Sequence, residues 1–145
     1  MDRIIRALVM DDYEDMLYLA NIYLSQAGFE VICFSDVPKI LDYLKDNNCD
    51  IIIMDYRQPQ TTGLEITRKI KELYVHHANT PVLIHTANIS STVYKPDLNK
   101  TIMKNCFPDC NPEDVALIDG ILPKIGTYNH VVAAINDILL KKNGI

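Results

Sequence analysis

Residues 50–55 read Asp-Ile-Ile-Ile-Met-Asp, and this stretch decides the fold class. Isoleucine is β-branched and apolar, and an apolar run without polar alternation is typical of a strand that is covered on both faces. Strands of this kind belong to parallel sheets that carry helices on either side. The stretch therefore predicts an α/β protein, in which further strands and helices alternate along the chain.

Strand-like and helix-like segments do alternate along the rest of the chain. Short apolar runs predict strands at residues 4–10, 30–34, 50–54, 81–86 and 120–124. Apolar residues at helical spacing predict helices at residues 15–27, 36–46, 63–73 and 128–142. Five strands that alternate with helices predict a doubly wound parallel sheet, and right-handed crossovers place helices on both of its faces.

The length and charge of the chain limit the classes of protein to which it can belong. Its 145 residues, 48% hydrophobic and 23% charged, predict a single globular domain over residues 1–145, without a sensor or DNA-binding module. A net charge of −5 argues against direct nucleic-acid binding, which needs clustered positive charge. No apolar run approaches a membrane span and no signal peptide is apparent, so we expect a cytoplasmic protein without membrane attachment.

The cysteine and histidine residues do not predict a zinc site. A matching second pair of ligands at zinc-site spacing is missing among Cys33, Cys49, Cys106, Cys110, His76, His77, His85 and His130. We therefore expect the cysteines to pack as small apolar side chains. His85 lies on a predicted strand and is expected to pack there, and the histidines at 76 and 77 suit the end of a helix.

Polar side chains follow the predicted strands at the points where the strands end. Asp11 and Asp12 follow the first strand, and Asp55 ends the third. Thr86 ends the fourth strand, and Lys124 ends the fifth. Ligand sites of doubly wound sheets lie beyond the carboxyl ends of the strands. Three carboxylates, a hydroxyl and an ammonium group are therefore predicted on one rim.

The predicted rim suits phosphoryl transfer to a carboxylate. Three neighbouring carboxylates repel one another unless a cation shares them, and Mg²⁺ takes carboxylates, waters and a phosphate oxygen. No glycine-rich loop follows a strand, so a nucleotide site is not indicated. An aspartate can act as the nucleophile, with Lys124 offsetting charge in the transition state and Thr86 hydrogen-bonding the attached phosphoryl group.

Each of these residues also has an ordinary structural interpretation. The acidic pair at 11 and 12 could cap a helix, and Asp55 could form a turn. Thr86 could be a plain strand residue, and Lys124 a solvated charge at the sheet edge. The occurrence of all of them at strand ends favours a common site.

Four motifs in this order resemble the response-regulator receiver domain of two-component signalling, over nearly the whole chain. They are the acidic pair Asp11-Asp12, the stretch 55–63, the pair Thr86-Ala87 and Lys124. Residues 55–63 read Asp-Tyr-Arg-Gln-Pro-Gln-Thr-Thr-Gly, against the family pattern Asp-x-x-Met-Pro-x-x-x-Gly, with Gln58 in place of methionine. The resemblance implies a flavodoxin-like strand order, 2-1-3-4-5, in a stand-alone receiver.

The resemblance also implies a function and a set of site residues. Asp55 would receive a phosphoryl group from a phosphohistidine on a sensor histidine kinase or a histidine phosphotransfer protein. Mg²⁺ would be held by Asp12 and Asp55, by Asp11 partly through water, and by the backbone carbonyl of Arg57. Thr86 would move toward the phosphoryl group and shift the surface around the fourth helix and fifth strand. The chain would catalyse its own phosphorylation and dephosphorylation, unlike a metabolic enzyme, and act through a downstream protein target.

Two positions near the predicted lysine depart from the family pattern. Ile125 follows Lys124 where the family has proline, and Pro123 precedes it. Proline is tolerated on an edge strand, because it cannot donate to a sheet ladder. Ile121 occupies the position of the family's switch aromatic, so the usual ring rotation cannot report phosphorylation.

The connection at 87–119 is longer than one helix and its loops require. Lys95-Pro96-Asp97 suits a helix start, Cys106-Phe107-Pro108 a break, and Asn111-Pro112 a second start. Long ordered connections are often functional. We expect this one to alter partner choice or dimerisation, with a homodimer forming through the 87–124 face.

Two other functions compete with the phosphoacceptor. The first is a pseudo-receiver that is not phosphorylated and serves as an interaction module. The departure at Ile121 and the long connection leave it open, whereas the retention of all the site residues argues against it. The second is a phosphatase of the haloacid-dehalogenase type, which also uses an aspartate nucleophile and Mg²⁺. That class needs a second aspartate two residues after the nucleophile, and here the residue is Arg57. The phosphoacceptor therefore remains the leading hypothesis.

Overall fold

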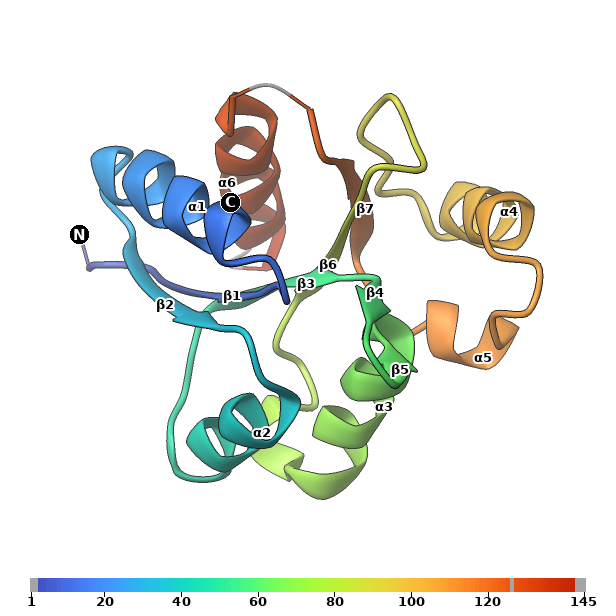
Figure 1. The fold of residues 1–145 in the computed structure, drawn as a ribbon, viewed down its shortest axis with the longest axis horizontal. Helices are drawn as coiled ribbons and strands as arrows, with labels where there is room; N and C mark the ends of the chain where they lie inside the picture. The colour runs from blue at the N-terminus through green and yellow to red at the C-terminus, as the bar shows by residue number, and fades with distance from the viewer. Residues whose placement is uncertain (1–2, 126, 143–145) are drawn as a thin grey trace.

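The centre of the molecule is a five-stranded parallel sheet. The computed structural model describes residues 3–125 and 127–142. The strands are β1 (Arg6–Met10), β2 (Glu30–Phe34), β3 (Ile51–Asp55), β6 (Val82–Thr86) and β7 (Gly120–Pro123). They lie in the order β2-β1-β3-β6-β7, so the predicted order 2-1-3-4-5 is confirmed (Figure 1).

Helices cover both faces of the sheet, as predicted. One face carries α1 (Glu14–Gln26) and α6 (Asn129–Lys142) (Figure 1). The other face carries α2 (Val37–Asp46), α3 (Gly63–Leu73), α4 (Pro96–Cys106) and the short α5 (Pro112–Val115). Within residues 3–125 and 127–142, no helix has the length and apolar character needed to cross a bilayer.

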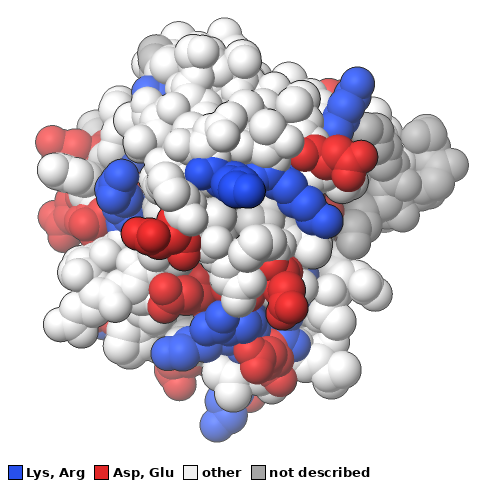
Figure 2. Space-filling model, turned by 90° about the vertical axis from the view of Figure 1, so that its right-hand side faces the viewer, with Lys and Arg blue, Asp and Glu red and all other residues white. Residues whose placement is uncertain are grey.

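The surface around α4 and α5 carries charges of both signs. Figure 2 shows basic and acidic side chains interleaved across the middle and lower parts of this side, below a largely uncharged region. Residues 87–94, which lie above α4 in Figure 1, include no charged residue. The side of the molecule made by the long connection therefore offers an uncharged region next to a mixed-charge one.

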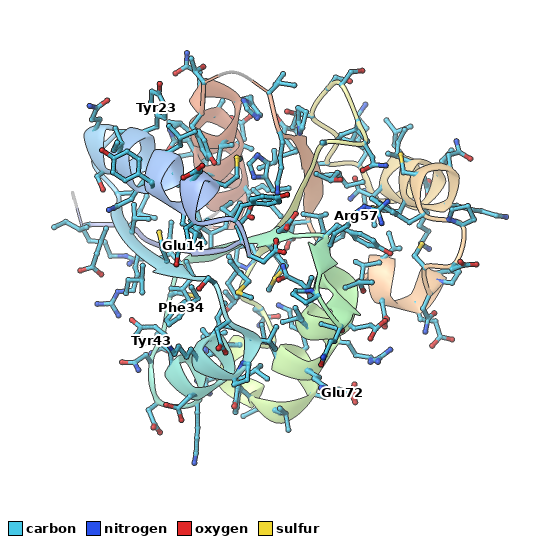
Figure 3. All side chains as sticks on the ribbon, in the orientation of Figure 1. Glu14, Tyr23, Phe34, Tyr43, Arg57 and Glu72 are labelled. Carbon is cyan, nitrogen blue, oxygen red and sulfur yellow. The ribbon has the colours of Figure 1, made fainter. Side chains whose placement is uncertain are left out.

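Aromatic and histidine side chains fasten α2 to its neighbours. The rings of Phe34 and Tyr43 lie 5.4 Å apart and link β2 to α2 (Figure 3). His77, in the short 3-10 helix η1 (Val75–His77), is buried, and its Nε2 donates to the carbonyl oxygen of Leu44 at 3.0 Å. Its Nδ1 accepts from the hydroxyl of Thr80 at 3.0 Å. The structural role expected for this histidine is confirmed.

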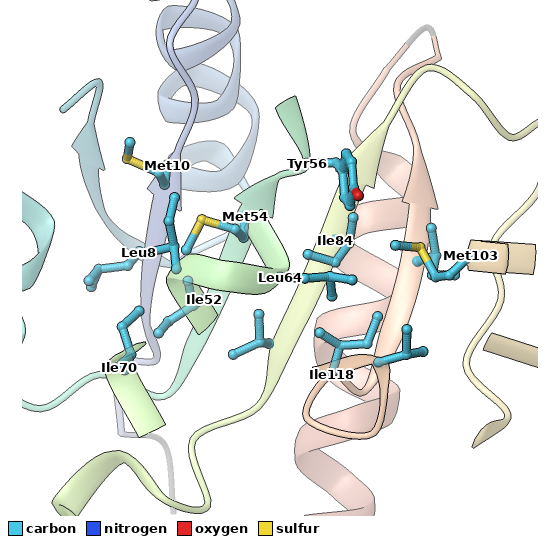
Figure 4. Packing of buried hydrophobic residues seen from close by; sticks show 14 of the residues in the cluster. Leu8, Met10, Ile52, Met54, Tyr56, Leu64, Ile70, Ile84, Met103 and Ile118 are labelled. Carbon is cyan, nitrogen blue, oxygen red and sulfur yellow. The ribbon is translucent and has the colours of Figure 1, made fainter. Parts of the chain in front are cut away.

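The two apolar cores explain the uninterrupted run in β3. Ile52 and Met54 belong to the core beneath α2, α3 and α4, together with Leu8 and Met10 of β1 (Figure 4). The alternate β3 residues, Ile51 and Ile53, belong to the core beneath α1 and α6. All four β3 side chains are buried, because successive residues of a strand point to opposite faces and both faces are covered.

The long connection forms two helices and a segment that returns along β7. The predicted helix starts are confirmed, with Pro96 at the start of α4 and Asn111 capping α5 through a bond from the Glu113 backbone N–H (2.9 Å). Before α4, Val93 pairs with Ile121 of β7 in an antiparallel bridge, with two backbone hydrogen bonds of 2.9 and 2.6 Å. Ile121, at the position of the missing switch aromatic, is fully buried.

A short hairpin occupies the stretch after β3, where the sequence predicts only a loop. Strands β4 (Arg57–Gln58) and β5 (Thr61–Thr62) pair antiparallel, and Pro59 and Gln60 turn the chain between them. The hairpin leads directly into α3, whose N-cap is Thr62. It therefore holds the residues that follow Asp55 in a defined conformation.

Candidate functional site

Three aspartate side chains meet at the carboxyl end of the sheet. Asp11 and Asp12 follow β1, and Asp55 is the last residue of β3, the neighbouring strand. One carboxylate oxygen from each residue lies within 4.8 Å of the others. Asp11 and Asp55 are buried, whereas Asp12 is exposed. The cluster therefore opens to solvent on the side of Asp12.

Lys124 bridges the two buried carboxylates. Its Nζ lies 2.8 Å from Oδ2 of Asp11 and 2.8 Å from Oδ1 of Asp55. The backbone N–H of Lys124 donates to the carbonyl oxygen of Thr86 at 2.9 Å, which fixes the lysine beside β6. Burial alone would lower the pKa of Lys124, but its hydrogen bonds to the two carboxylates outweigh burial and raise it.

The surroundings of Asp55 make its charged form costly. Burial raises the pKa of this carboxyl from 3.8 to about 6. The Lys124 ammonium opposes the rise, and the neighbouring Asp11 and Asp12 carboxylates add to it. A cation placed among the three carboxylates would offset their mutual repulsion and would therefore favour the ionised form of each.

The hydroxyl of Thr86 is bonded within its own loop. It donates to Oδ1 of Asn88 at 3.2 Å, and it accepts from the backbone N–H of Asn88 at 3.3 Å. Thr86 is buried at the end of β6, the strand beside that of Asp55. The hydroxyl thus lies on the predicted rim, where its present partner is Asn88.

Tyr56 and Arg57, which follow Asp55, contact a residue from the long connection. The ring of Tyr56 stacks on Phe107, with centroids 3.6 Å apart and an angle of 17° between the planes. The guanidinium carbon of Arg57 lies 5.4 Å from the centre of the same ring. Phe107 caps the C-terminus of α4, so the end of this helix lies directly against the residues that follow Asp55.

Gly63 and Gln58 hold the backbone of Asp55 from the other side. A Cβ atom at Gly63 would lie 2.5 Å from the carbonyl oxygen of Asp55, so only glycine fits at this close approach. The side-chain amide of Gln58 donates to the same carbonyl oxygen at 3.0 Å. The residue that replaces the family's methionine therefore helps to position the central aspartate.

The donor set fits a hard divalent cation. Mg²⁺ prefers oxygen ligands and is commonly bound by one or two carboxylates with several waters. The carbonyl oxygen of Tyr56 accepts a hydrogen bond from the Gly63 N–H at 2.7 Å. Because hydrogen-bonded and non-hydrogen-bonded pairs alternate along antiparallel strands, Arg57 and Thr62 form a non-hydrogen-bonded pair. The carbonyl of Arg57 therefore points away from β5. The three carboxylates and this carbonyl could hold Mg²⁺.

His85 lies behind the site, packed in the interior. It is buried, and its ring makes an edge contact with Tyr128 at 5.7 Å. Burial lowers the pKa of His85 from 6.5 to about 3, with the nearby Lys124 and His130 acting in the same direction. The expected packing role is confirmed. The four cysteines are free thiols, partly buried against the two cores.

The structure brings together four of the five predicted rim residues and places the fifth beside them. Asp11, Asp12, Asp55 and Lys124 form one cluster. Sequence reasoning did not identify Asn88 or Phe107. Asn88 carries a local signal, because asparagine two residues after a strand threonine suits a side-chain turn. Phe107 is distant in sequence from Tyr56, and no pattern in the sequence connects them.

The doubly wound fold, with an acidic rim bridged by a lysine, is that of a CheY-like receiver. A family model described as the response regulator receiver domain matches residues 7–115. The chain belongs to this family, the receiver domains of two-component response regulators. The resemblance to receiver domains, predicted from the four motifs, is confirmed.

Curated relatives match part of this chain and a small part of their own length. The CAI-1 autoinducer sensor kinase/phosphatase CqsS of Vibrio cholerae is 33% identical over 85 residues, which are 59% of this chain and 12% of CqsS. The regulatory protein AtoC of Escherichia coli is 30% identical over 87 residues, which are 60% of this chain and 18% of AtoC.

Solved structures match nearly the whole chain in fold. The chemotaxis protein CheY4 of Vibrio cholerae has a TM-score of 0.72 and 20% identity, and the alignment covers 94% of this chain and 99% of CheY4. The response regulator TrrA of Thermotoga maritima, in complex with Mg²⁺-BeF, has a TM-score of 0.71 and 18% identity over 93% of this chain and 99% of TrrA. These likenesses establish the fold.

Proposed function

We propose that this chain is a phosphoacceptor, in which Asp55 takes a phosphoryl group from a phosphohistidine. The observation that carries the proposal is the placement of Asp55 at the end of β3, 2.8 Å from the Lys124 ammonium and within the three-carboxylate cluster. The donor would be a sensor histidine kinase or a histidine phosphotransfer protein. The family membership of the chain supports this choice of partner.

The transfer is a displacement at phosphorus. An oxygen of Asp55 forms a bond to phosphorus while the bond between phosphorus and the donor imidazole nitrogen breaks, and the imidazole leaves with the electron pair. Lys124 holds Oδ1 of Asp55, so we assign the attack to Oδ2. Although the pKa of Asp55 is raised to about 6, most of this carboxyl is still ionised at pH 7 and able to attack.

A bound Mg²⁺ would neutralise charge on the equatorial phosphoryl oxygens. Asp12, Asp55, Asp11 and the backbone carbonyl of Arg57 would hold it, the exposed Asp12 being the residue most accessible to solvent. Lys124 would stay within reach of the phosphoryl oxygens, because Asp11, 2.8 Å from its ammonium group, would retain it after Asp55 is phosphorylated. Two positive groups would thus act on the acceptor together.

Conformational switching would involve the bond between Thr86 and Asn88. To contact a phosphoryl group, the Thr86 hydroxyl must give up Oδ1 of Asn88, which begins the segment leading to Val93. Phosphorylation would therefore bias the position of this segment. It would not act through the rotation of an aromatic ring, because residue 121 is isoleucine. Output would leave through the 87–124 face, to a downstream protein or a second copy of this chain.

The test is phosphorylation by a small donor. We expect acetyl phosphate with Mg²⁺ to add a base-labile phosphoryl group to the wild-type chain, detected by intact mass. Asp55→Asn should remove the adduct, whereas Asp46→Asn, at the exposed end of α2, should retain it. The absence of an adduct on the wild type, or an unchanged adduct on Asp55→Asn, would overturn the proposal.

A pseudo-receiver is the second candidate. The buried, bridged Ile121 favours it, because an aromatic switch is absent at this position. A chain that binds its partner but takes no phosphoryl group from either acetyl phosphate or a phosphohistidine donor would support this alternative.

A further inference from the structure

The ring of Phe107 contacts Tyr56 and Arg57, the two residues that follow the candidate phosphoacceptor Asp55. Tyr56 and Phe107 stack with their centroids 3.6 Å apart, and each residue is only 6% exposed. Arg57 lies on the α4 side of the hairpin (Figure 3), with its guanidinium 5.4 Å from the same ring. A single side chain of the long connection therefore contacts both Tyr56 and Arg57.

The hairpin that carries Arg57 is too small to hold its own conformation. Strands β4 and β5 have two residues each, and isolated two-stranded hairpins are at best marginally stable in water. Its backbone is attached to the site through the bond from Gly63 to Tyr56 and the bond from Gln58 to Asp55. Phe107, at the end of α4, adds a side-chain contact from outside the hairpin.

The same hairpin supplies a metal ligand in the proposed site. The carbonyl of Arg57 points away from β5, and its direction depends on the backbone torsions between Tyr56 and Gln58. A stacked ring on Tyr56 and a cation–π contact with Arg57 restrict the side chain of the residue that bears this carbonyl and that of the residue before it. Removing the ring would take away both of these restraints on the backbone next to the carbonyl.

We propose that Phe107 is a positioning residue for the divalent cation, holding the side chains of Tyr56 and Arg57 so that the Arg57 carbonyl faces the three aspartates. The inference rests on the proposed function for the identity of the cation site. It assigns to the long connection a role in metal affinity, because Phe107 ends α4. Movement of α4, for example on partner binding, would change the affinity for Mg²⁺, and Mg²⁺ would reciprocally favour the present position of α4.

The test compares Mg²⁺ affinity among phenylalanine variants. The probe is MgCl₂ alone, titrated while amide NMR shifts are followed, so that folding and binding are read in one experiment. We expect Phe107→Leu to weaken binding by about tenfold, the low end for the loss of a residue that orients a metal ligand. Phe107→Tyr keeps the ring and should restore wild-type affinity.

A matched control separates positioning from general destabilisation. Phe29→Leu is the same substitution at a similarly buried position, in the core beneath α1 and α6. We expect it to lower the melting temperature and leave the Mg²⁺ affinity unchanged. An unchanged affinity in Phe107→Leu, or an equal loss in Phe29→Leu, would overturn the inference.

A second variant covers the case in which Phe107→Leu does not fold. Tyr56→Leu removes the same stack from the hairpin side and should weaken Mg²⁺ binding similarly. The double variant should lose no more than Phe107→Leu alone, because that variant already lacks the stack that Tyr56→Leu removes. A wild-type chain that binds Mg²⁺ but accepts no phosphoryl group would refute the proposed function and leave the role of Phe107 standing.

Discussion

Gly63 shows how strictly one residue is specified by the site next to it. A Cβ atom there would meet the carbonyl oxygen of Asp55 at 2.5 Å and Cγ of Met54 at 2.9 Å. The first of these is a backbone atom and cannot rotate away. Gly63→Ala is expected to lower the free energy of unfolding by about 1–3 kcal/mol and to slow phosphorylation by displacing Asp55. Urea denaturation and the rate of adduct formation measure the two effects.

Gly28 provides the control for this substitution. Its φ is +97°, and no atom lies within 4 Å of the position that a Cβ would take, so Gly28→Ala is strained without a clash. We expect a loss of about 1 kcal/mol and an unchanged phosphorylation rate. An equal loss of rate in both variants would show that Gly63 matters only for stability.

His85 predicts a specific acid sensitivity. Its pKa is about 3 in the folded chain and about 6.5 in the unfolded chain, so the unfolded state binds a proton first as the pH falls. The stability that neutral His85 contributes is complete above pH 6.5 and is lost progressively toward pH 3. Between about pH 7 and pH 4, the wild type should lose about 2–3 kcal/mol more than His85→Gln, measured by denaturation in urea at each pH. Parallel pH profiles for the two proteins would contradict this assignment.

The rim residues could be predicted because parallel strands end at one edge. Asp55 and Lys124 are distant in sequence, yet each lies at the end of a strand of the same sheet, so the alternation of strands and helices was enough to bring them together. The contact of Tyr56 with Phe107 could not be predicted. It depends on the path of the connection after β6, which side chains from many elements determine jointly.

At the scale of elements, α5 is attached to α3 by an ion pair. Nη1 of Arg68 in α3 lies 2.9 Å from Oδ2 of Asp114, which is buried in α5. Arg68→Met leaves this carboxylate without the arginine and should cost about 1–2 kcal/mol, since Arg68 itself is partly exposed. A double-mutant cycle with Asp114→Asn, followed by urea denaturation, measures the coupling.

The pair of Arg68 with Glu72 is the internal comparison. These side chains lie 3.4 Å apart on the surface of α3, where ion pairs contribute little. Glu72→Gln should therefore change stability by less than about 0.5 kcal/mol. If Glu72→Gln destabilised the fold as much as Arg68→Met, the arginine would stabilise the protein through its pair with Glu72 within α3 and not through its pair with Asp114.

The elements differ in how well local sequence specifies them. Helix starts at Pro96 and Asn111 were predictable, because a first-turn proline and a capping asparagine act within a few residues. The β4–β5 hairpin was not, because strands of two residues are too short to show a periodic pattern. The bridge from Val93 to Ile121 was also unpredictable, because a single pair leaves no alternation to detect.

At the scale of the whole molecule, metal binding should stabilise the fold. A ligand that binds only the folded state at about ten times its Kd adds about 1.4 kcal/mol. For a chain of this size, the melting temperature should rise by about 4 °C. Asp12→Asn should abolish most of the rise, because Asp12 is the exposed carboxylate of the cluster. Thermal melts over an MgCl₂ series, with Asp46→Asn as the control, provide the measurement.

An equal rise in melting temperature with MgCl₂ for the wild type and for Asp12→Asn would show that the cation binds elsewhere on the acidic surface. The comparison uses the slope of melting temperature against Mg²⁺ concentration, because the loss of one like charge among three carboxylates changes the starting stability as well.

The bridge between Val93 and Ile121 also affects how copies of this chain behave toward one another. β7 is an outer strand of the sheet, and the exposed backbone of such strands can pair with a strand from another molecule. Here the N–H and carbonyl of Ile121 are both bonded to Val93 of the same chain. The chain thus occupies part of its own sheet edge, and detachment of the Val93 segment would expose a template for edge-to-edge aggregation.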